Sequence, residues 1–226
     1  MMGSKKNDVS KTVEGNLMPS TTGGILHGAA HYDLQIGLAT RGRERVFREK
    51  VLRLARLETG ESVLDIGCGT GTLAIAAKRH VGPTGTVYGI DASPEMIDTA
   101  GKKAKKAGIE VVFKKEFAQA LPFPDAQFDV VLSTLMLHHL PKQARQQCAC
   151  EIRRVLKPDG RVLAVDFGEP SQEKSGLLSH FHHRHGHVSL RDIIAVLNEA
   201  GLNCIESGAV GISDLQFVLA VAPCCE

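Results

Sequence analysis

The fold of this chain is decided by residues 63–73, which read Val-Leu-Asp-Ile-Gly-Cys-Gly-Thr-Gly-Thr-Leu. Residues 88–91 read Tyr-Gly-Ile-Asp, and Asp91 lies twenty residues after Gly71. This order predicts a strand, a glycine turn, a helix and a second strand that ends in a carboxylate. Such a unit holds an adenosine, because glycines let the backbone approach a ligand closely and the carboxylate accepts hydrogen bonds from ribose hydroxyls.

The spacing of the glycines indicates which nucleoside is bound. Gly67-x-Gly69-x-Gly71 differs from the G-x-G-x-x-G of dinucleotide sites, where a helix N-terminus faces a pyrophosphate. Asp65 stands just before the turn, where it would repel an anion. S-adenosylmethionine carries an α-ammonium and a sulfonium but no phosphate, so the pattern favours this cofactor. Glycines alone are a weak signal because tight turns use them for steric reasons, but Asp65 and Asp91 strengthen it.

Four blocks in sequence order resemble the class I S-adenosylmethionine-dependent methyltransferases, particularly the branch with the ubiquinone/menaquinone-biosynthesis C-methyltransferases. They are residues 63–71, 89–96, 118–131 and 151–167. The second block reads Gly-Ile-Asp-Ala-Ser-Pro-Glu-Met, and the third contains Leu-Pro-Phe-Pro-Asp and Phe-Asp-Val-Val. Similarity is looser at 31–33 and 41–57, and extends only to the general pattern from 168 to 226. The resemblance implies an enzyme that uses S-adenosylmethionine and releases S-adenosylhomocysteine.

The rest of the chain alternates short β-branched runs with helical patterns, which indicates a mostly parallel sheet covered on both faces. We expect strands at 62–66, 85–90, 110–114, 128–134, 161–167, 203–208 and 215–222. Helices are expected near 70–80, 94–107, 142–156 and 189–200, with caps at Ser93-Pro94, Gly108 and Ser189/Asp192. The predicted fold is α/β: a Rossmann-like, doubly wound, seven-stranded sheet with helices on both faces and an N-terminal helical lid.

The length of 226 residues favours a single domain. Residues 1–26 are rich in Ser, Thr, Gly and Lys and read as a disordered or mobile tail. The methyltransferase domain is expected to span 27–226. Within it we expect a helical lid and brace at 27–58, made of a short helix followed by a longer amphipathic one. A cofactor-binding core is expected at 59–167, and an acceptor-pocket segment with the last helix and strands at 168–226.

Composition narrows the possible partners. The formal charge of +2 comes from 27 basic and 25 acidic residues, so no overall field points to nucleic acid. No stretch approaches the roughly 20 apolar residues of a membrane span, and the start of the chain lacks a signal-peptide pattern. We therefore expect a cytoplasmic protein with six free cysteines, no nucleic-acid partner and no integral membrane segment. Monomer and homodimer both remain open.

The predicted cofactor site lies beyond the carboxyl ends of the strands. Asp91 is expected to accept from the ribose diol rather than merely cap the next helix, and Asp65 to meet the methionine end or support the turn. Met96 and Ile90 would line the adenine slot, although core packing explains them almost as well. The full expected set is Tyr32, Asp65, Gly67, Gly69, Thr70, Gly71, Asp91, Ala92, Met96, Phe117, Ala118 and Thr134.

Three of these positions are assigned through the resemblance. The resembled family commonly has Asp or Asn where this chain has Phe117, so either Phe117 stacks on adenine beside the Ala118 backbone, or the adenine slot is altered. Thr134 corresponds to a position near the amino-acid end of the cofactor. Tyr32 occupies a lid position where its ring could meet the sulfonium, with core packing of the first helix as the alternative.

Two groups of histidines are candidates for the acceptor side. His138-His139 follow the fourth strand, and His139 is the first candidate for a general base, with a simple bond to a carbonyl as the alternative. The second group lies at 180–187, with His183 as its candidate; a solvated loop is the simpler interpretation and metal binding a minor one. No metal site is expected. The lysines at 102, 103, 105 and 106 read as a solvated helix face.

The leading functional hypothesis is a methyltransferase for a small-molecule acceptor that is quinone-like, aromatic, lipid or a natural product. The segment between the fifth strand and the last helix, 168–188, is short, which suits a modest acceptor. Leu-His-His-Leu at 137–140 differs from the Arg-Asn-containing stretch of the quinone subgroup, which weakens the assignment to a quinone C-methyltransferase. The alternatives are a non-catalytic S-adenosylmethionine-binding regulatory subunit and a macromolecule methyltransferase.

Overall fold

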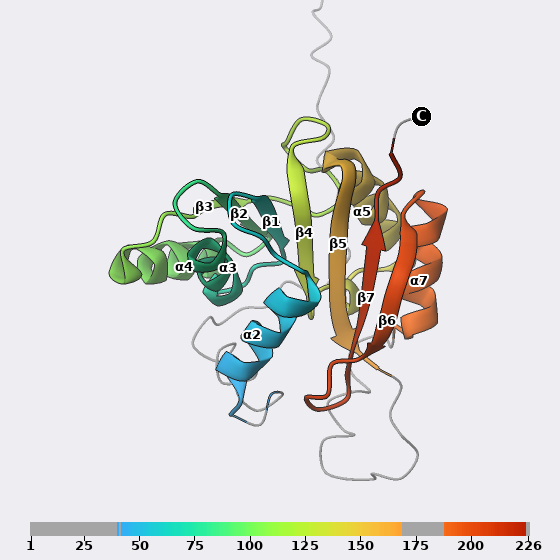
Figure 1. Cartoon of the computed structure of the whole chain (residues 1–226), viewed down its shortest axis with the longest axis horizontal. Coiled ribbons are helices and arrows are strands. Elements are labelled where there is room, and N and C mark those ends of the chain that lie inside the picture. Colours follow the sequence, from blue (N-terminus) through green and yellow to red (C-terminus); the bar gives the residue numbers. More distant parts are fainter. Residues whose placement is uncertain (1–39, 41, 169–187, 225–226) are drawn as a thin grey trace, which may run out of the picture.

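The structure is a computed structural model that describes residues 40, 42–168 and 188–224 (Figure 1). Its elements are, in chain order, α2 (Glu44–Leu54), β1 (Ser62–Ile66), α3 (Thr72–Val81), β2 (Thr86–Asp91), α4 (Pro94–Ala107), β3 (Val112–Lys115), β4 (Phe128–Thr134), η1 (Leu137–His139), α5 (Lys142–Val155), β5 (Leu156–Phe167), α7 (Leu190–Glu199), β6 (Asn203–Ala209) and β7 (Leu215–Val221). The expected alternation of strands and helices is confirmed.

The strands form one seven-stranded sheet in the order β3-β2-β1-β4-β5-β7-β6. β1 to β5 run parallel, and β7 runs antiparallel to both of its neighbours, β5 and β6. The strand order reverses between β1 and β4, and in open α/β sheets this is where a ligand sits, beyond the carboxyl ends of the strands. The predicted doubly wound, mostly parallel sheet is therefore confirmed.

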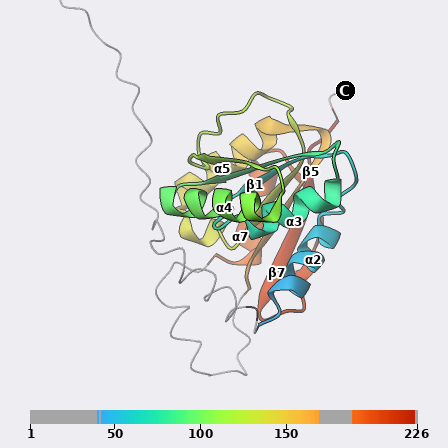
Figure 2. The same cartoon turned by 90° about the vertical axis from the view of Figure 1, so that its left-hand side faces the viewer.

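Helices cover both faces of the sheet (Figures 1 and 2). α3 packs on β1 and β2 and against α2 and α4, and α5 and α7 pack on one another at the other face. The central strands are buried on both faces, so consecutive residues such as Val63 and Leu64 are both fully covered. This explains their aliphatic composition and makes Asp65, in the same strand, an exception that needs a reason.

Helix caps fall where the sequence places them. The Ser93 hydroxyl accepts a hydrogen bond from the Met96 N–H, and α4 ends at Gly108 in the left-handed conformation. Ser189 and Asp192 form the expected capping box at the start of α7. The largest difference in a boundary is at the last parallel strand, which begins at Leu156 rather than 161, because Phe128 pairs with Leu156 before a register shift.

The expected N-terminal helices are covered only in part. α2 lies within the longer of the two, and its buried residues Phe47, Val51 and Leu52 join the core on the α3 side of the sheet. The residues before 40, including the expected tail and the first lid helix, lie outside the described residues. In the part of the chain that is described, no helix has the length and apolar character needed to cross a membrane.

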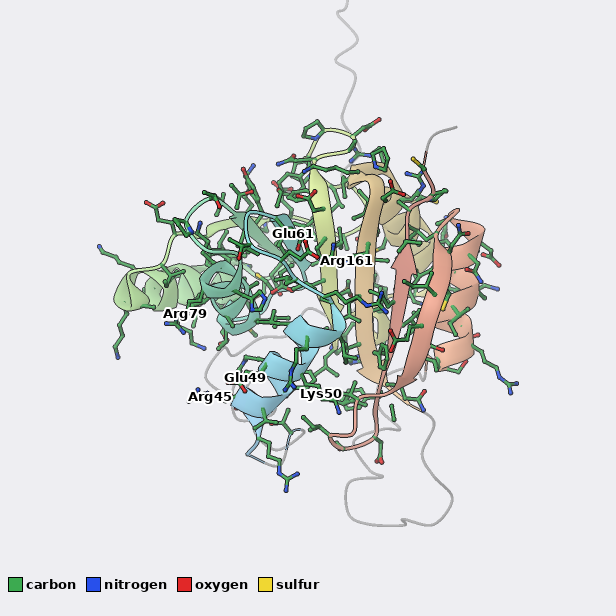
Figure 3. All side chains as sticks on the ribbon, in the orientation of Figure 1. Arg45, Glu49, Lys50, Glu61, Arg79 and Arg161 are labelled. Carbon is green, nitrogen blue, oxygen red and sulfur yellow. The ribbon has the colours of Figure 1, made fainter. Side chains whose placement is uncertain are left out.

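Paired charges hold the amino-terminal end of the sheet. Glu61, just before β1, forms a two-armed ion pair with Arg161 of β5, with Nη1 and Nη2 at 2.8 and 2.9 Å from the carboxylate oxygens. Figure 3 shows these two side chains side by side. Arg161 Nε also donates to the Ala55 carbonyl at 2.6 Å, which fixes the end of α2. Nearby, Lys157 Nζ lies 2.7 and 2.8 Å from the two oxygens of Asp129.

Candidate cofactor and acceptor site

The glycine turn between β1 and α3 requires glycine for two reasons. Gly67, Gly69 and Gly71 all have positive φ, at 71°, 52° and 75°. A Cβ at Gly67 would lie 2.4 Å from Met136 Cγ, and a Cβ at Gly71 would lie 2.7 Å from the Cβ of a residue in α4. The turn is therefore tightly packed by the segment after β4 on one side and by α4 on the other.

Asp91 ends β2 and holds this turn. Its Oδ2 accepts the Gly69 N–H and its Oδ1 accepts the Ser93 N–H, both at 2.9 Å. The cap of α4 is supplied by Ser93, so the alternative of Asp91 as that cap does not apply. Burial raises the pKa of Asp91, and the N–H groups of Ser93, Gly69 and Ala92 offset part of the rise. Each carboxylate oxygen retains a lone pair for a further donor.

The carboxylate of Asp65 is buried with no positive charge to balance it among the described residues. The residue is 1% exposed, and neither side-chain oxygen has a hydrogen-bond partner among the residues that the structure describes. Burial, and then the neighbouring charge of Asp91, raise its pKa from 3.8 to about 7, while the backbone of Ala74 acts weakly in the opposite direction. No N–H group of residues 67–71 donates to Asp65 within the described structure, so its role as a support of the turn stays a prediction. Buried carboxylates normally have a partner, so this one is set up for a donor or a cation.

Strand register brings Thr134 to the same side of the sheet as Asp65. Asp65 pairs with Leu132, and Thr134 lies two residues further along β4, hence on the same face. Between them, Ser133 points to the other face, where its buried hydroxyl also has no partner within the described residues. Unsatisfied polar groups thus gather at the carboxyl ends of β1 and β4, the strands that flank the reversal in strand order.

The expected adenine wall lies beside Asp91. The Glu116 N–H donates to the Asp91 carbonyl at 3.1 Å, which brings the segment with Phe117 and Ala118 against the end of β2. Phe117 is half-buried and Ala118 is buried. Met96 at the start of α4 is 2% exposed, while Ile90 is part of the hydrophobic core. Ile90 therefore packs in the hydrophobic core, which was the alternative to its lining the adenine slot.

Lys103 corrects the expectation of a uniformly solvated lysine face on α4. Its Nζ donates to Thr70 Oγ1 at 2.8 Å and to Thr72 Oγ1 at 3.3 Å, so it ties α4 to the glycine turn. Lys102, in contrast, is exposed and paired with Asp98, as expected of a solvated residue. The signal lay in the helical spacing: Lys103 adjoins the buried stripe formed by Met96, Ala100 and Ala104.

The acceptor side contains a histidine–carboxylate pair that sequence reasoning missed. His138 Nδ1 lies 2.6 Å from Asp166 Oδ1, and the His138 backbone N–H donates to Asp166 Oδ2 at 3.1 Å. Asp166, near the end of β5, is 2% exposed. The predicted candidate, His139, places its ring 3.9 Å from the His138 ring. The sequence offered one signal for Asp166, because it is an isolated acid near the end of an otherwise aliphatic strand.

Two predicted site residues cannot be located. Tyr32, and His183 with the rest of the histidine group at 180–187, lie outside the described residues. The cysteines that the structure describes, at 68, 148, 150, 204 and 224, are free, as predicted. Cys68 lies within the glycine turn, where burial and then the carboxylates of Asp65 and Asp91 raise its thiol pKa well above the usual value.

Comparison with known proteins gives consistent matches. A family described as "Methyltransferase domain" matches residues 63–160. The demethylmenaquinone methyltransferase of Lactobacillus johnsonii is 36% identical over 157 residues, which are 68% of this chain and 64% of that protein. The ubiquinone/menaquinone biosynthesis C-methyltransferase UbiE of Burkholderia mallei is 33% identical over 160 residues, 70% of this chain and 65% of that protein. The chain thus spans slightly less than two thirds of these relatives.

Solved structures share the fold. A SAM-dependent methyltransferase from Aquifex aeolicus aligns with a TM-score of 0.68 and 27% identity over 79% of this chain and 93% of that chain. The [4+2]-cyclase SpnF aligns equally well, with 19% identity over 80% of this chain and 82% of that chain, and shows that the fold alone does not assign a reaction. Taken with the four sequence blocks and the glycine turn, these matches show that the chain belongs to the class I S-adenosylmethionine-dependent methyltransferase family.

Proposed function

We propose that this protein is an S-adenosylmethionine-dependent methyltransferase that methylates a small molecule and releases S-adenosylhomocysteine. The observation that carries the proposal is the pair of carboxylates at the glycine turn. Asp65 is buried without a partner, Asp91 lies beside it, and no cation pairs with either among the described residues. A ligand that brings an ammonium and a sulfonium to this turn supplies the missing positive charge, whereas a phosphate ligand would be repelled.

The residues of the site fit this cofactor from end to end. Asp91 would accept from the ribose diol, Asp65 would meet the α-ammonium, and Phe117 would stack on the adenine. The backbone of the turn would lie against the ligand, as a glycine-rich turn allows. The full proposed set remains Tyr32, Asp65, Gly67, Gly69, Thr70, Gly71, Asp91, Ala92, Met96, Phe117, Ala118 and Thr134.

Methyl transfer requires the protein mainly to align the acceptor with the methyl group. Bound S-adenosylmethionine supplies a methyl group already activated by its sulfonium. The chain has to hold the acceptor in line with that methyl and exclude water, and positioning of this kind is worth about 7–11 kcal/mol. The acceptor would approach over the carboxyl ends of β4 and β5, where Thr134 and His139 lie; His183, in the segment between β5 and α7, is a further proposed contact.

The small-molecule acceptor is supported by the relatives and by the chain itself. The curated relatives are named as quinone methyltransferases, so quinone-like and other aromatic acceptors lead, followed by lipids and natural products. The net charge of +2 gives no general attraction for nucleic acid, which disfavours a macromolecular acceptor of that kind. The expectation of a cytoplasmic protein, monomer or homodimer, rests on sequence alone.

A regulatory subunit that binds the cofactor without turnover is the second candidate, favoured only by Phe117 in place of the usual acidic or amide residue. Calorimetry with S-adenosylmethionine, followed by assay of S-adenosylhomocysteine release on cell extract with a deuteromethyl-labelled cofactor, separates the two. Heat of binding together with a new labelled product supports the enzyme. Heat without any labelled product favours the regulatory subunit, and absence of heat contradicts both.

A further inference from the structure

We infer that the side of α2 that faces β6 forms a second ligand site, which binds a molecule carrying a phosphomonoester dianion. The site is a cavity of about 390 Å³ lined by Lys50, Arg53, Leu54, Arg56 and Glu206. None of these residues belongs to the proposed cofactor set. The inference therefore goes beyond the proposed function and can fail or succeed separately from it.

The cavity lies between α2 and the last two strands of the sheet. Arg53 and Leu54 follow Lys50 by three and four positions, so the three side chains are neighbours on the helix surface. The turn between β6 and β7 lies opposite: a Cβ added at Gly211 would be 3.0 Å from Lys50 Nζ. Figure 3 shows Lys50 on the side of α2 toward that turn and Arg45 on the other side.

An ion pair joins the two walls of the cavity. Arg56 Nη2 lies 2.7 Å from Glu206 Oε2, so the residue that follows the end of α2 is linked to β6. Arg56 has a φ of 52°, in the left-handed region where a helix end usually has glycine. An arginine in this conformation indicates that its side chain is needed there. Glu206 neutralises Arg56 and leaves the other two cations of the cavity without a carboxylate.

Lys50 and Arg53 are these unpaired cations. Neither forms a hydrogen bond or an ion pair with any residue that the structure describes, and Lys50 is half-buried. The other two arginines of α2 have partners within the helix: Arg45 pairs with Glu49, and Arg48 with the first glutamate of α2, both at 2.9 Å. The helix thus pairs its arginines elsewhere and leaves two cations unpaired where the cavity lies.

The helix dipole accounts for only one of the two. Arg53 lies in the last turn of α2, where a cation interacts favourably with the negative end of the helix. Lys50 lies before that turn, and Asp214, the acid of the β6–β7 turn, forms no ion pair with it in the described structure. A half-buried ammonium without a partner costs free energy, and a bound anion would offset that cost.

Charge and size define the class of ligand. The two unpaired cations match a phosphomonoester, which carries a charge of about −1.5 to −2 near pH 7. The guanidinium of Arg53 offers paired N–H donors to phosphate oxygens, and the ammonium of Lys50 adds a point charge. A cavity of about 390 Å³ is within the range of small-molecule sites, and Leu54 provides an apolar wall for the organic part of the ligand.

The test compares the phosphomonoester group in solution and on a lipid, with the full-length protein. Calorimetry measures binding of glycerol 3-phosphate, with glycerol as the uncharged counterpart. Co-sedimentation measures binding to phosphatidylcholine vesicles with and without phosphatidic acid. We expect saturable binding of a phosphate form at concentrations up to about 10 mM, and none of glycerol or of phosphatidylcholine alone. Binding of glycerol 3-phosphate identifies a soluble ligand, and binding confined to phosphatidic acid identifies a lipid headgroup.

Three variants assign the binding to this cavity. Lys50→Gln with Arg53→Gln should weaken it by about 100-fold, because each charged contact contributes about tenfold. Arg45→Gln with Lys102→Gln, the matched control, removes the same two charges from exposed ion pairs and should bind as wild type. Glu206→Gln frees Arg56 and should strengthen binding about two- to fivefold. Melting temperatures without ligand check that each variant folds.

The outcomes separate this inference from the proposed function. Absence of binding by both phosphate forms would overturn it, as would equal losses in the double variant and its control, or no gain in Glu206→Gln. S-adenosylmethionine affinity should be the same in wild type and all three variants. Failure of the wild type to bind S-adenosylmethionine would contradict the proposed function and leave the phosphate site standing.

Discussion

The two ends of the β-sheet differ in how their buried and half-buried carboxylates are paired. At the amino end, Glu61 is matched by Arg161 and Asp129 by Lys157, with nitrogen–oxygen distances of 2.7–2.9 Å. At the carboxyl end, neither Asp65 nor Asp91 has a cationic partner in the described parts of the chain. Charges at the first end stabilise the fold, whereas those at the second weaken it.

The difference in charge pairing indicates that the ligand site lies at the carboxyl end of the sheet. An unpaired buried carboxylate costs stability, and burial together with Asp91 raises the pKa of Asp65 to about 7. At the amino end, Glu61 and Asp129 each have a cation that offsets this cost. A positively charged ligand would pair with the carboxylates at the carboxyl end, as Arg161 and Lys157 pair with those at the amino end. The predictions below test that contrast, from the largest expected effect to the smallest.

Asp91→Ala should weaken S-adenosylmethionine binding the most. The substitution removes both proposed ribose contacts, each worth about 1.5–3 kcal/mol as a hydrogen bond to a charged group, so the dissociation constant should rise by at least about 100-fold. Calorimetry measures it. The control is Asp129→Asn at the amino end, which should bind as wild type; equal affinity of Asp91→Ala and wild type would refute the ribose role.

Glu61→Gln should lower the free energy of unfolding and leave cofactor affinity unchanged. It leaves Arg161 partly buried without its carboxylate, and breaking a pair of this kind costs about 3–5 kcal/mol when burial is complete. With 14–16% exposure, the loss in unfolding free energy should be near the lower end of that range. Urea unfolding measures it. Cofactor affinity of the folded variant should not change, and a change there would undermine the separation of the two ends.

Asp65→Asn should stabilise the protein without ligand in alkaline solution. The pKa of Asp65 is raised in the folded state, so the protonated form favours folding and stability is lost as pH rises from about 4 through about 7. Removing the charge should therefore add on the order of 2–4 kcal/mol at about pH 8 and little below about pH 4. Chemical denaturation at both values decides the matter; equal stability of variant and wild type at the higher pH would show that Asp65 is not an unpaired charge.

Gly67→Ala should destabilise the protein more than the same change at a left-handed glycine with open space around it. A left-handed residue with a Cβ costs about 1–2 kcal/mol, and at Gly67 the added carbon would also lie 2.4 Å from Met136 Cγ and 2.8 Å from Met136 Cβ, so Met136 would have to shift. Gly108→Ala is the matched control, because Gly108 has a similar φ but nothing within 4 Å of the added Cβ. The difference in melting temperature between the variants isolates the contact. Identical melting temperatures would mean that Met136 does not restrict the turn.

Local patterns predicted most of this molecule. The helix at 94–107 was bounded correctly because Ser93-Pro94 and Gly108 fix its ends through backbone conformation. The glycine turn and Asp91 were found because their spacing follows from a strand, a helix and a strand laid side by side. Asp65 was singled out because an acid just before the glycine turn would repel an anionic ligand.

What could not be predicted depends on contacts between distant residues. Asp166 lies 28 positions from His138, and nothing local couples them. The contact from Lys103 to Thr70 spans 33 positions, and the lysines around Lys103 gave no local sign of it. The early start of β5 came from pairing of Leu156 with Phe128, which no single-strand pattern reveals. The proposed roles of Tyr32 and His183 remain predictions from sequence.

The central claim is that the unpaired carboxylate at the carboxyl end awaits a cationic ligand, and the pH dependence of cofactor affinity tests it most directly. Binding of S-adenosylmethionine should favour ionised Asp65, so wild-type affinity should rise with pH toward a plateau above about 7, by up to about tenfold per pH unit below it. Asp65→Asn should bind more weakly and without this rise. Calorimetry that gives the same pH profile for both proteins would contradict the account.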